Sequence, residues 1–343
     1  MIRARPSEIV FTSGGTESDN AALFGVTEST RGFAANDSGK KTRHIVTTAF
    51  EHHAVLHACA ALERCGVEVT YVPVGSDGIV DPQDIRRVLR PETILVSVMH
   101  ANNELGTHQP IPEIASVAAE AGVLLHTDAV QSAGKVPLDV SQLGVDLLSL
   151  SGHKFGAPQG VGALFIRKGR NLEPLLHGGG SERGRRAGTE NVAGIVGLGK
   201  AAELAMAHMA ENAARIAALR DRLEQGLLDR VPQARINGDR ARRVPNTSNV
   251  AFPGVDGESL VIALDLVGVA CSAGAACSSG AVDASHVLRA IGLSPVEARS
   301  SIRFSLGHTT TEQDISQALE LISSAVARQR ELASTRLEVL SPR

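Results

Sequence analysis

Short apolar runs alternate with helix-like stretches over the first two-thirds of this 343-residue chain. The apolar runs have the length of strands, and the stretches between them are long enough for crossover helices. One run, Ile-Leu-Val-Ser-Val-Met at 94–99, is apolar on both faces, as a strand covered by helices on both sides requires. The alternation predicts an α/β fold built on a mostly parallel sheet.

The predicted strands are 8–12, 44–48, 68–73, 93–99, 123–127, 146–149 and 162–166. Predicted helices between them are 54–65, 81–89 and 112–121. Residues 193–228 are rich in Ala, Leu, Glu and Arg and predict one long helix or two successive ones.

Beyond that helical stretch the pattern changes to α+β, with strands near 248–252 and 301–306 and helices near 258–266 and 311–331. We therefore predict a large domain at 1–210, a smaller α+β domain at 211–331 and a loosely held tail at 332–343.

Composition narrows the function classes. The net charge is -3, Trp is absent and Tyr71 is the single tyrosine, which disfavours a nucleic-acid binder. No apolar segment of about 18–20 residues predicts a membrane span. The four cysteines contain no Cys-x-x-Cys pair, so we expect no structural metal site. They do not form a disulfide framework either, and no signal peptide is recognisable, so we expect a cytoplasmic protein.

Lys154 ends the string 151–154, Ser-Gly-His-Lys, which follows an apolar run at the carboxyl edge where open α/β sheets bind ligands. An amine there can lose part of its hydration and form a Schiff base, although a surface lysine has the same sequence pattern. Asp128 lies at another strand end, where a carboxylate can keep a pyridine-type ring nitrogen protonated or cap the next helix. Gln131 follows three residues later and could reach the phenolic oxygen of such a ring.

Gly14, Gly15 and Thr16 follow the first predicted strand directly. Glycines followed by hydroxyl residues at a helix start present backbone N–H groups to a phosphate, although any strand–turn–helix junction can carry them. His52 opens the helix 54–65, where it could lie over a cofactor ring and move protons, or serve as the helix cap.

Cys277 stands in a run of small residues, 272–280, that predicts a loop with an accessible thiol; a small buried cysteine is the alternative. Arg303 lies within a predicted strand, where its guanidinium suits a substrate carboxylate or a structural ion pair.

The order and spacing of these strings resemble the cysteine desulfurases of the NifS/IscS type. These belong to the class V aminotransferase group of fold type I enzymes, which depend on pyridoxal 5'-phosphate (PLP). The resemblance runs from about Pro6 to Arg328 and rests on the strings 11–20, 51–52, 99–106, 128–131, 151–154, 177–180, 186–189, 273–277 and 300–307.

The resemblance implies roles for particular residues. Those implied to bind PLP are Gly15, Thr16, Asn103, Asp128, Gln131, Ser151, His153, Lys154 and Thr189. Lys154 would hold the cofactor, Asp128 would pair with its ring nitrogen and His52 would stack on its ring. Asn103 and Arg303 would bind the substrate carboxylate. Thr189 would complete the phosphate site of a neighbouring subunit, which implies a homodimer.

The implied reaction converts L-cysteine to L-alanine and leaves a persulfide on Cys277. That sulfur would pass to a protein acceptor such as an iron–sulfur scaffold, or serve another thiolation. The long run around Cys277 resembles the branch that serves such scaffolds. Cys277 could also be a transient iron–sulfur ligand.

Two other functions remain open in the sequence: another class V activity, such as an aminotransferase or selenocysteine lyase, and a truncated homologue acting as a sulfur-transfer partner. The second arises because family members usually carry some tens of residues before the phosphate loop, including an Asp-Asn-Ala-Ala-Thr-like strand. Here Met1 lies shortly before that loop, and we expect an N-terminal segment to be missing.

Overall fold

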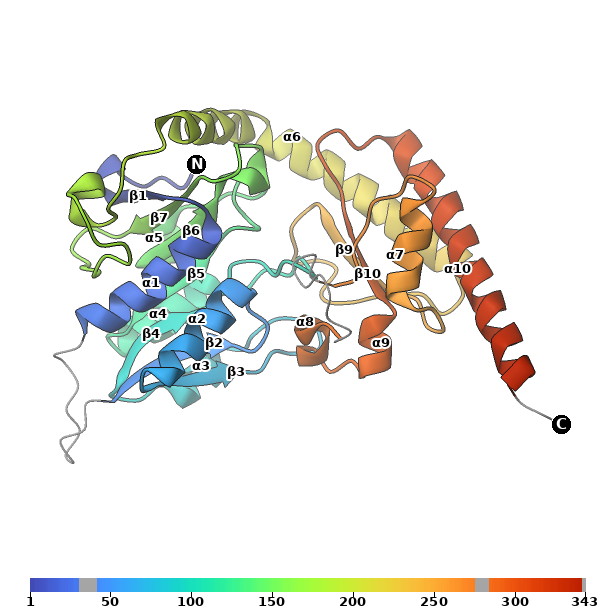
Figure 1. The fold of residues 1–343 in the computed structure, drawn as a ribbon, viewed down its shortest axis with the longest axis horizontal. Helices are drawn as coiled ribbons and strands as arrows, with labels where there is room; N and C mark the ends of the chain where they lie inside the picture. The colour runs from blue at the N-terminus through green and yellow to red at the C-terminus, as the bar shows by residue number, and fades with distance from the viewer. Residues whose placement is uncertain (31–41, 275–283, 341–343) are drawn as a thin grey trace. The chain divides into compact units, whose positions relative to one another are not determined.

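The computed structural model describes residues 1–30, 42–274 and 284–340 (Figure 1). Contacts divide the chain into two compact units. The first comprises Met1–Gly75, Ile79–Asn102 and His108–Met209; the second comprises Ser76–Gly78, Asn103–Thr107 and the chain from Ala210 onward. Because contacts define compact units and not folding units, the limits 1–210 and 211–331 remain a prediction about domains.

A seven-stranded sheet forms the centre of the first unit, in the order β1-β7-β6-β5-β4-β2-β3. Its strands are β1 (Ile9–Thr12), β2 (Arg43–Thr48), β3 (Val67–Val72), β4 (Thr93–Ser97), β5 (Leu124–Asp128), β6 (Leu147–Ser151) and β7 (Gly162–Ile166). Only β7, among these strands, runs antiparallel to its neighbours β1 and β6. The prediction of a mostly parallel α/β fold is confirmed.

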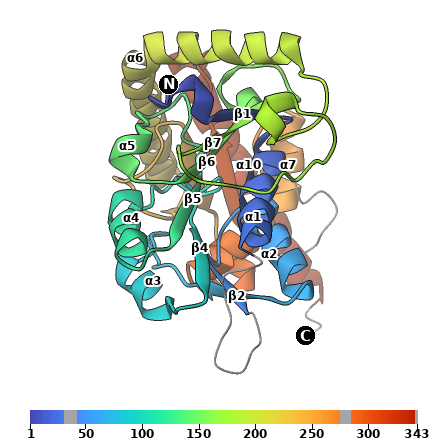
Figure 2. The same ribbon diagram turned by 90° about the vertical axis from the view of Figure 1, so that its left-hand side faces the viewer.

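Helices cover both faces of this sheet (Figure 2). On one face lie α1 (Gly15–Ser29) and α2 (His53–Arg64); on the other lie α3 (Pro82–Val88), α4 (Ile111–Glu120) and α5 (Val140–Leu143). Neighbouring residues of one strand enter opposite cores, as Leu95 and Val96 of β4 do. This is why the strands are apolar on both faces.

Three short 3-10 helices complete the first unit: η1 (Pro6–Glu8), η2 (Gly152–Phe155) and η3 (Ser181–Gly184). The long helix α6 (Val192–Arg230) is continuous and belongs to both units. Every helix in the described part of the chain is too short or too polar to cross a membrane.

The second unit packs helices on an antiparallel sheet in the order β10-β9-β8. Its strands are β8 (Arg235–Ile236), β9 (Thr247–Ala251) and β10 (Ser301–Ser305). Its helices are α7 (Gly257–Asp265), α8 (His286–Ala290), α9 (Pro295–Arg299) and α10 (Glu312–Leu340). Helix α10 enters the segment 332–343 that was predicted as a tail, because neither Gly nor Pro interrupts it before Leu340.

A buried ion pair joins α6 to the segment before β9. The side chains of Glu224 and Arg243 are 0% and 1% exposed, with two contacts of 2.5 and 2.7 Å between carboxylate and guanidinium. The Ser248 hydroxyl donates a third hydrogen bond to Glu224, over 2.6 Å. Such a pair stabilises the second unit only while both charges are present.

We expect Glu224→Gln to lower the free energy of unfolding by about 3–5 kcal/mol, because the buried Arg243 would keep only the exposed Asp221, 3.5 Å away, as a counter-charge. The matched control is Glu312→Gln, which breaks the exposed pair with Arg222 and should cost less than about 1 kcal/mol. Urea unfolding followed by circular dichroism measures both. Equal losses in the two variants would contradict this account.

Candidate functional site

The turn between β1 and α1 is built on glycines. Gly14 has φ 155° and ψ -174°, a conformation that only glycine adopts readily. A Cβ on Gly162 of β7 would lie 2.7 Å from the Gly14 Cα, so the two backbones need this absence of side chains. Helix α1 begins at Gly15, and its first backbone N–H groups point out of the turn without partners in the helix.

Three strand ends meet at Gly15. A Cβ there would lie 2.7 Å from Val130 Cγ2, which follows β5, and 3.4 Å from Ser151 Cβ at the end of β6. The parallel arrangement of β1, β5 and β6 brings their carboxyl ends to one edge, as expected for a ligand site in an open α/β sheet. Gly15 and Ser151 thus lie together, and Thr16 is exposed in the first turn of α1.

The segment Ser151–Phe155 turns away from β6 into η2. Ser151 Oγ lies 2.9 Å from Nδ1 of His153, so these two residues, which the resemblance implies bind PLP, are hydrogen-bonded to each other. Burial and then the charge of Lys154 lower the pKa of His153, which favours a neutral imidazole at neutral pH. Lys154 itself is exposed.

Asp128 is the buried acid of this edge, with 5% of its surface exposed. Its Oδ1 accepts a hydrogen bond of 2.8 Å from the backbone N–H of Val130. Burial raises the pKa of Asp128 to about 6, although the Val130 N–H and the positive charge of Lys154 act to lower it. A cation placed against this carboxyl would therefore favour its ionised form. Gln131 accepts a hydrogen bond from Lys135 Nζ over 3.1 Å.

His52 is the N-cap of α2: its Nδ1 accepts a hydrogen bond of 3.1 Å from the backbone N–H of Ala54. This is the alternative that the sequence left open. Capping orients the ring, and the stacking role of His52 stays a prediction.

A bidentate ion pair ties the glycine turn to a distant loop. Arg186 donates to the two carboxylate oxygens of Glu17 over 2.8 and 3.2 Å. Burial acts to raise the pKa of Glu17, but the hydrogen bonds from Arg186 and Ser13 outweigh it and hold the pKa below its usual value. Thr189, three residues after Arg186, is exposed and helps to line a cavity of about 230 Å³ beside Ser13.

Asn103 and Arg303 meet within the second unit. Arg303 Nη1 donates to the backbone oxygen of Asn103 over 3.0 Å. Two buried atoms beside this contact, Arg303 Nε and Asn103 Oδ1, have no hydrogen-bond partner among the described residues. An orphaned guanidinium N–H is a binding position for a carboxylate.

Cys277 lies outside the described residues. Of the other cysteines, Cys59 is buried and Cys271 half-buried, and burial raises the pKa of Cys59 to about 12 and that of Cys271 to about 11. Both sulfurs therefore stay protonated and poorly nucleophilic at neutral pH. Cys65 is exposed.

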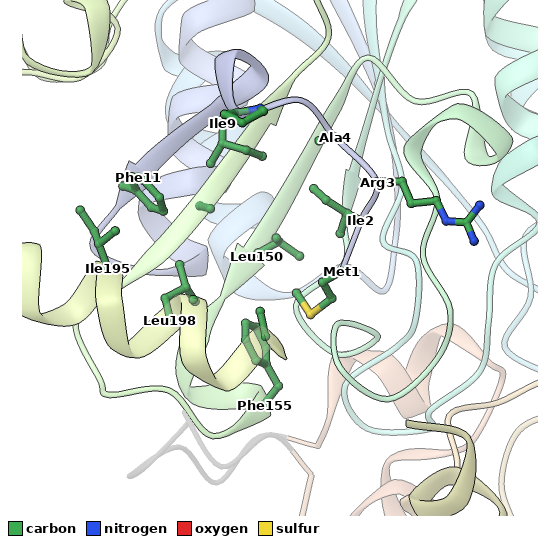
Figure 3. Close-up of a pocket in the computed structure, with 14 residues that line it drawn as sticks. Met1, Ile2, Arg3, Ala4, Ile9, Phe11, Leu150, Phe155, Ile195 and Leu198 are labelled. Atoms are coloured by element: carbon green, nitrogen blue, oxygen red, sulfur yellow. The ribbon is translucent and has the colours of Figure 1, made fainter. Parts of the chain in front are cut away.

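A second cavity in the first unit is apolar. It has about 340 Å³ and lies between the N-terminal residues, the strands and α6 (Figure 3). Phe155, Leu198 and Met1 line it, and Figure 3 shows the side chain of Arg3 pointing away from it. Most of the other side chains that line it are apolar, so this cavity does not suit the phosphate of the predicted cofactor.

Comparison with known proteins identifies the family. The aminotransferase class-V family model matches residues 1–318. The chain belongs to the aminotransferase class-V family. The chain is 49% identical to the cysteine desulfurase IscS of Dictyoglomus turgidum, over 98% of this chain and 84% of that protein. It is 51% identical to the IscS of Methanosarcina thermophila, over 97% of this chain and 80% of that protein.

The solved structure of a NifS-like protein has the same fold. Its TM-score is 0.86 at 38% sequence identity, and the match covers 95% of this chain and 84% of the other. The resemblance to NifS/IscS-type desulfurases and the fold type expected from it are confirmed. The family is one of PLP-dependent enzymes.

Sequence reasoning assigned no role to two buried acids of this class-V site, Glu51 and Asp19. Glu51 is fully buried, and its Oε1 accepts hydrogen bonds from Thr48 Oγ1 over 2.5 Å and from the Met99 N–H over 2.9 Å. The pKa of Glu51 is raised to about 8, mainly by burial and also by the charge of Asp128. The hydrogen bonds from Thr48 and Met99 act to lower it. Glu51 directly precedes His52 in the string 51–52, which is one of those that carry the family resemblance. Its place in that string could have marked Glu51 as a site residue.

Asp19 is 1% exposed on the inner face of α1. Burial and then the charge of Asp128 raise the pKa of Asp19 well above its usual value. An acid on the apolar side of a predicted helix marks a candidate functional residue, since acids are seldom buried without a partner.

The raised pKa of Glu51 predicts a pH-dependent stability. The folded protein keeps the Glu51 proton between pH 4.5 and about 8, where an unfolded glutamate has lost it. The contribution of the Glu51 proton to the free energy of unfolding is therefore complete below pH 4.5 and is lost as the pH rises through about 8. Glu51→Gln should flatten the fall in unfolding free energy across this window, measured by urea titrations without added cofactor. An unchanged slope would show that Glu51 is ionised in the folded protein.

The cap at His52 predicts a contrast between two variants. His52→Asn replaces the ring by a side chain that also caps helices, so the melting temperature should stay close to that of the wild type. His52→Ala removes the acceptor and should cost about 1 kcal/mol of unfolding free energy. Thermal unfolding measures both, and equal melting temperatures for the two variants would argue against a cap.

Proposed function

We propose that this class-V family member is a PLP-dependent L-cysteine desulfurase. The observation that carries the proposal is the meeting of three strand ends in one unit, which gathers the glycine turn, the buried Asp128 and the Ser151–Lys154 segment. The relatives named cysteine desulfurase support the same reaction.

The residues at this edge fit PLP. The phosphate has a matching cradle in the backbone N–H groups at the start of α1, where Gly15 packs directly against Val130 and Ser151. The ring nitrogen would have a partner in Asp128, a buried carboxyl whose pKa is raised by burial. Lys154 follows Ser151 by three residues, within η2, and its positive charge favours the ionised form of Asp128. When bound, PLP supplies an electron-accepting ring that stabilises negative charge on the substrate carbon.

The chain's own groups would do the rest of the chemistry. Asp128 would hold the ring nitrogen protonated and keep it fixed at the end of β5. The Lys154 Nζ would hold the cofactor and then carry protons between substrate carbons. His52, oriented by its hydrogen bond to the Ala54 N–H, would cover the ring and exclude water from one face.

Asn103 and Arg303 would bind the α-carboxylate of L-cysteine. The support is the pair of unpartnered buried atoms between these residues, among those described, which a carboxylate and a bridging water can satisfy.

Cys277 would accept the sulfur. Its thiolate would attack the substrate sulfur, so a new S–S bond forms while the carbon–sulfur bond of the substrate breaks. The electron pair of that bond stays on carbon, which takes up a proton and leaves as L-alanine; the product on the chain is a Cys277 persulfide. The thiols of the buried Cys59 and the half-buried Cys271, whose pKa values are raised, are unsuited to this attack.

We further propose a cytoplasmic homodimer that passes sulfur to a protein acceptor such as an iron–sulfur scaffold. Thr189 is exposed in the single chain, as a residue that serves the phosphate site of a second subunit would be. A persulfide is a labile sulfur donor, so it needs an acceptor close by. In such a transfer Cys277 could ligate the nascent cluster transiently.

The test measures alanine and sulfide released from L-cysteine by PLP-loaded protein in the presence of a thiol reductant. We expect Cys277→Ser to lower turnover at least about 100-fold, because a hydroxyl cannot replace a thiolate as sulfur acceptor. The matched control, Cys271→Ser, should retain turnover within about twofold.

Equal turnover of wild type and Cys277→Ser would reject Cys277 as the acceptor. Transfer of the amino group to pyruvate or glyoxylate, without loss of sulfur, would replace the proposal by an aminotransferase. Absence of the visible absorbance of lysine-bound PLP would reject the cofactor assignment itself.

A further inference from the structure

A buried glutamate of the second unit contacts the chain on both sides of the segment 275–283, which carries Cys277. Glu104 is 0% exposed, and its Oε2 accepts a hydrogen bond of 2.6 Å from Ser285 Oγ. A Cβ built on Gly274 would lie 3.6 Å from the same oxygen and 3.4 Å from Ser285 Cβ. Gly274 is the last described residue before Cys277, and Ser285 is the second described residue after it. The two described ends that flank the segment therefore meet at one carboxyl oxygen.

Each of these two ends is also tied to an element of the second unit. Ser272 and Arg303 of β10 exchange two backbone hydrogen bonds, of 3.2 and 2.7 Å. The Ser272 hydroxyl donates to the backbone oxygen of Gly274 over 3.1 Å. On the other side Ser285 is the N-cap of α8, where its Oγ accepts from the Leu288 N–H over 3.2 Å. The first end thus follows a bridge to β10, and the second begins a capped helix.

The chain around Glu104 is fixed to the small sheet. The side-chain amide of Asn249 on β9 donates to the Glu104 backbone oxygen over 3.5 Å. Arg303 of β10 donates to the backbone oxygen of the preceding residue, Asn103, over 3.0 Å. Glu104 therefore connects the two ends to the strand that carries Arg303, the proposed partner of the substrate carboxylate.

The contact with Ser285 accounts for an acid at this buried position. Burial raises the pKa of Glu104, although the Ser285 hydrogen bond and the charges of His286 and Arg303 act to lower it. An apolar side chain would avoid the cost of burying a carboxyl, but it could not accept a hydrogen bond from Ser285. The acceptor oxygen is therefore the property that this position uses.

The length of the chain makes these ends important for the reaction. Cys277 follows Gly274 by three residues, and three extended residues span at most about 11 Å. The place where Gly274 is held therefore limits the region that the thiol can reach. Joining the ends beforehand also lowers the conformational entropy that the attack on the substrate sulfur would still lose.

We propose that Glu104 is a positioning residue for sulfur transfer, because its carboxyl joins the two ends that flank the Cys277 segment. It accepts from Ser285 on one side and packs beside Gly274 on the other. Glu104 acts through the chain that carries the thiol and not on the substrate. Its role in the reaction rests on the proposed function, but the joining of the two ends does not.

The first experiment measures hydrogen exchange of the whole chain by mass spectrometry, without added cofactor. We expect Glu104→Ala to speed exchange about fivefold in both 271–274 and 285–289, because each end loses its contact with the carboxyl. Glu104→Gln keeps an acceptor oxygen for Ser285 and should leave both stretches close to the wild type. A response at one end only, or equal responses of the Ala and Gln variants, would overturn the proposal.

Ser285→Ala tests the same contact from its other side and carries the experiment if Glu104→Ala does not fold. The matched control is Ser294→Ala, which removes the exposed N-cap of α9 in the same way but lies outside the contact with Glu104. We expect Ser285→Ala to speed exchange in 271–274 and Ser294→Ala to leave that stretch unchanged. Unchanged exchange of 271–274 in Ser285→Ala would contradict the joining of the ends.

The second experiment measures turnover of L-cysteine by PLP-loaded protein and the rate of persulfide formation on Cys277 in a single turnover. We expect Glu104→Ala to lower kcat and this rate about tenfold and to leave KM within about twofold, because positioning of the thiol matters only after the substrate is bound. Glu104→Gln should recover most of the rate. A raised KM at unchanged kcat would show that Glu104 serves substrate binding, which would overturn the proposal.

The two experiments separate this inference from the proposed function. If the wild type releases no alanine or sulfide while exchange at both ends responds to Glu104→Ala, the function fails and the joining of the ends stands. If the wild type turns over and neither end responds, the inference about Glu104 fails alone.

Discussion

The candidate site depends on the burial of the Asp128 carboxyl at the end of a strand that helices cover on both faces. A buried carboxyl costs free energy unless a partner or a proton compensates it, and here burial already raises its pKa to about 6. The same burial makes Asp128 a strong partner for a cation. The sheet imposes this cost because parallel strands need two covered faces.

The neighbours of Asp128 limit that cost in different ways. The Val130 N–H donates to one oxygen, and the positive charge of Lys154 favours the ionised form. Glu51 and Asp19 would add negative charge, but burial and the charge of Asp128 raise the pKa of each. Burial thus raises the pKa of all three acids, Asp128, Glu51 and Asp19.

Local sequence carried enough information to predict the strand ends and the residues that follow them. Apolar runs on both faces predicted a covered parallel sheet, and Lys154 and Asp128 could be placed at its carboxyl edge. Helix limits were less certain: α10 extends beyond the predicted 331, since helix ends depend on breakers that the chain lacks there. His52 had two interpretations, and only the position of the Ala54 N–H identifies it as a cap.

The sequence by itself determined the fold class, the family and which polar residues follow which strands, because these depend on local periodicity and on the order of short strings. Only the tertiary structure decided which of these residues meet. It placed Gly15 against Val130 and Ser151, left Arg303 Nε without a partner among the described residues, and buried Asp19 beside His126. Those contacts join residues far apart in the chain, and proton affinity depends on burial and on neighbouring charges that no local pattern contains.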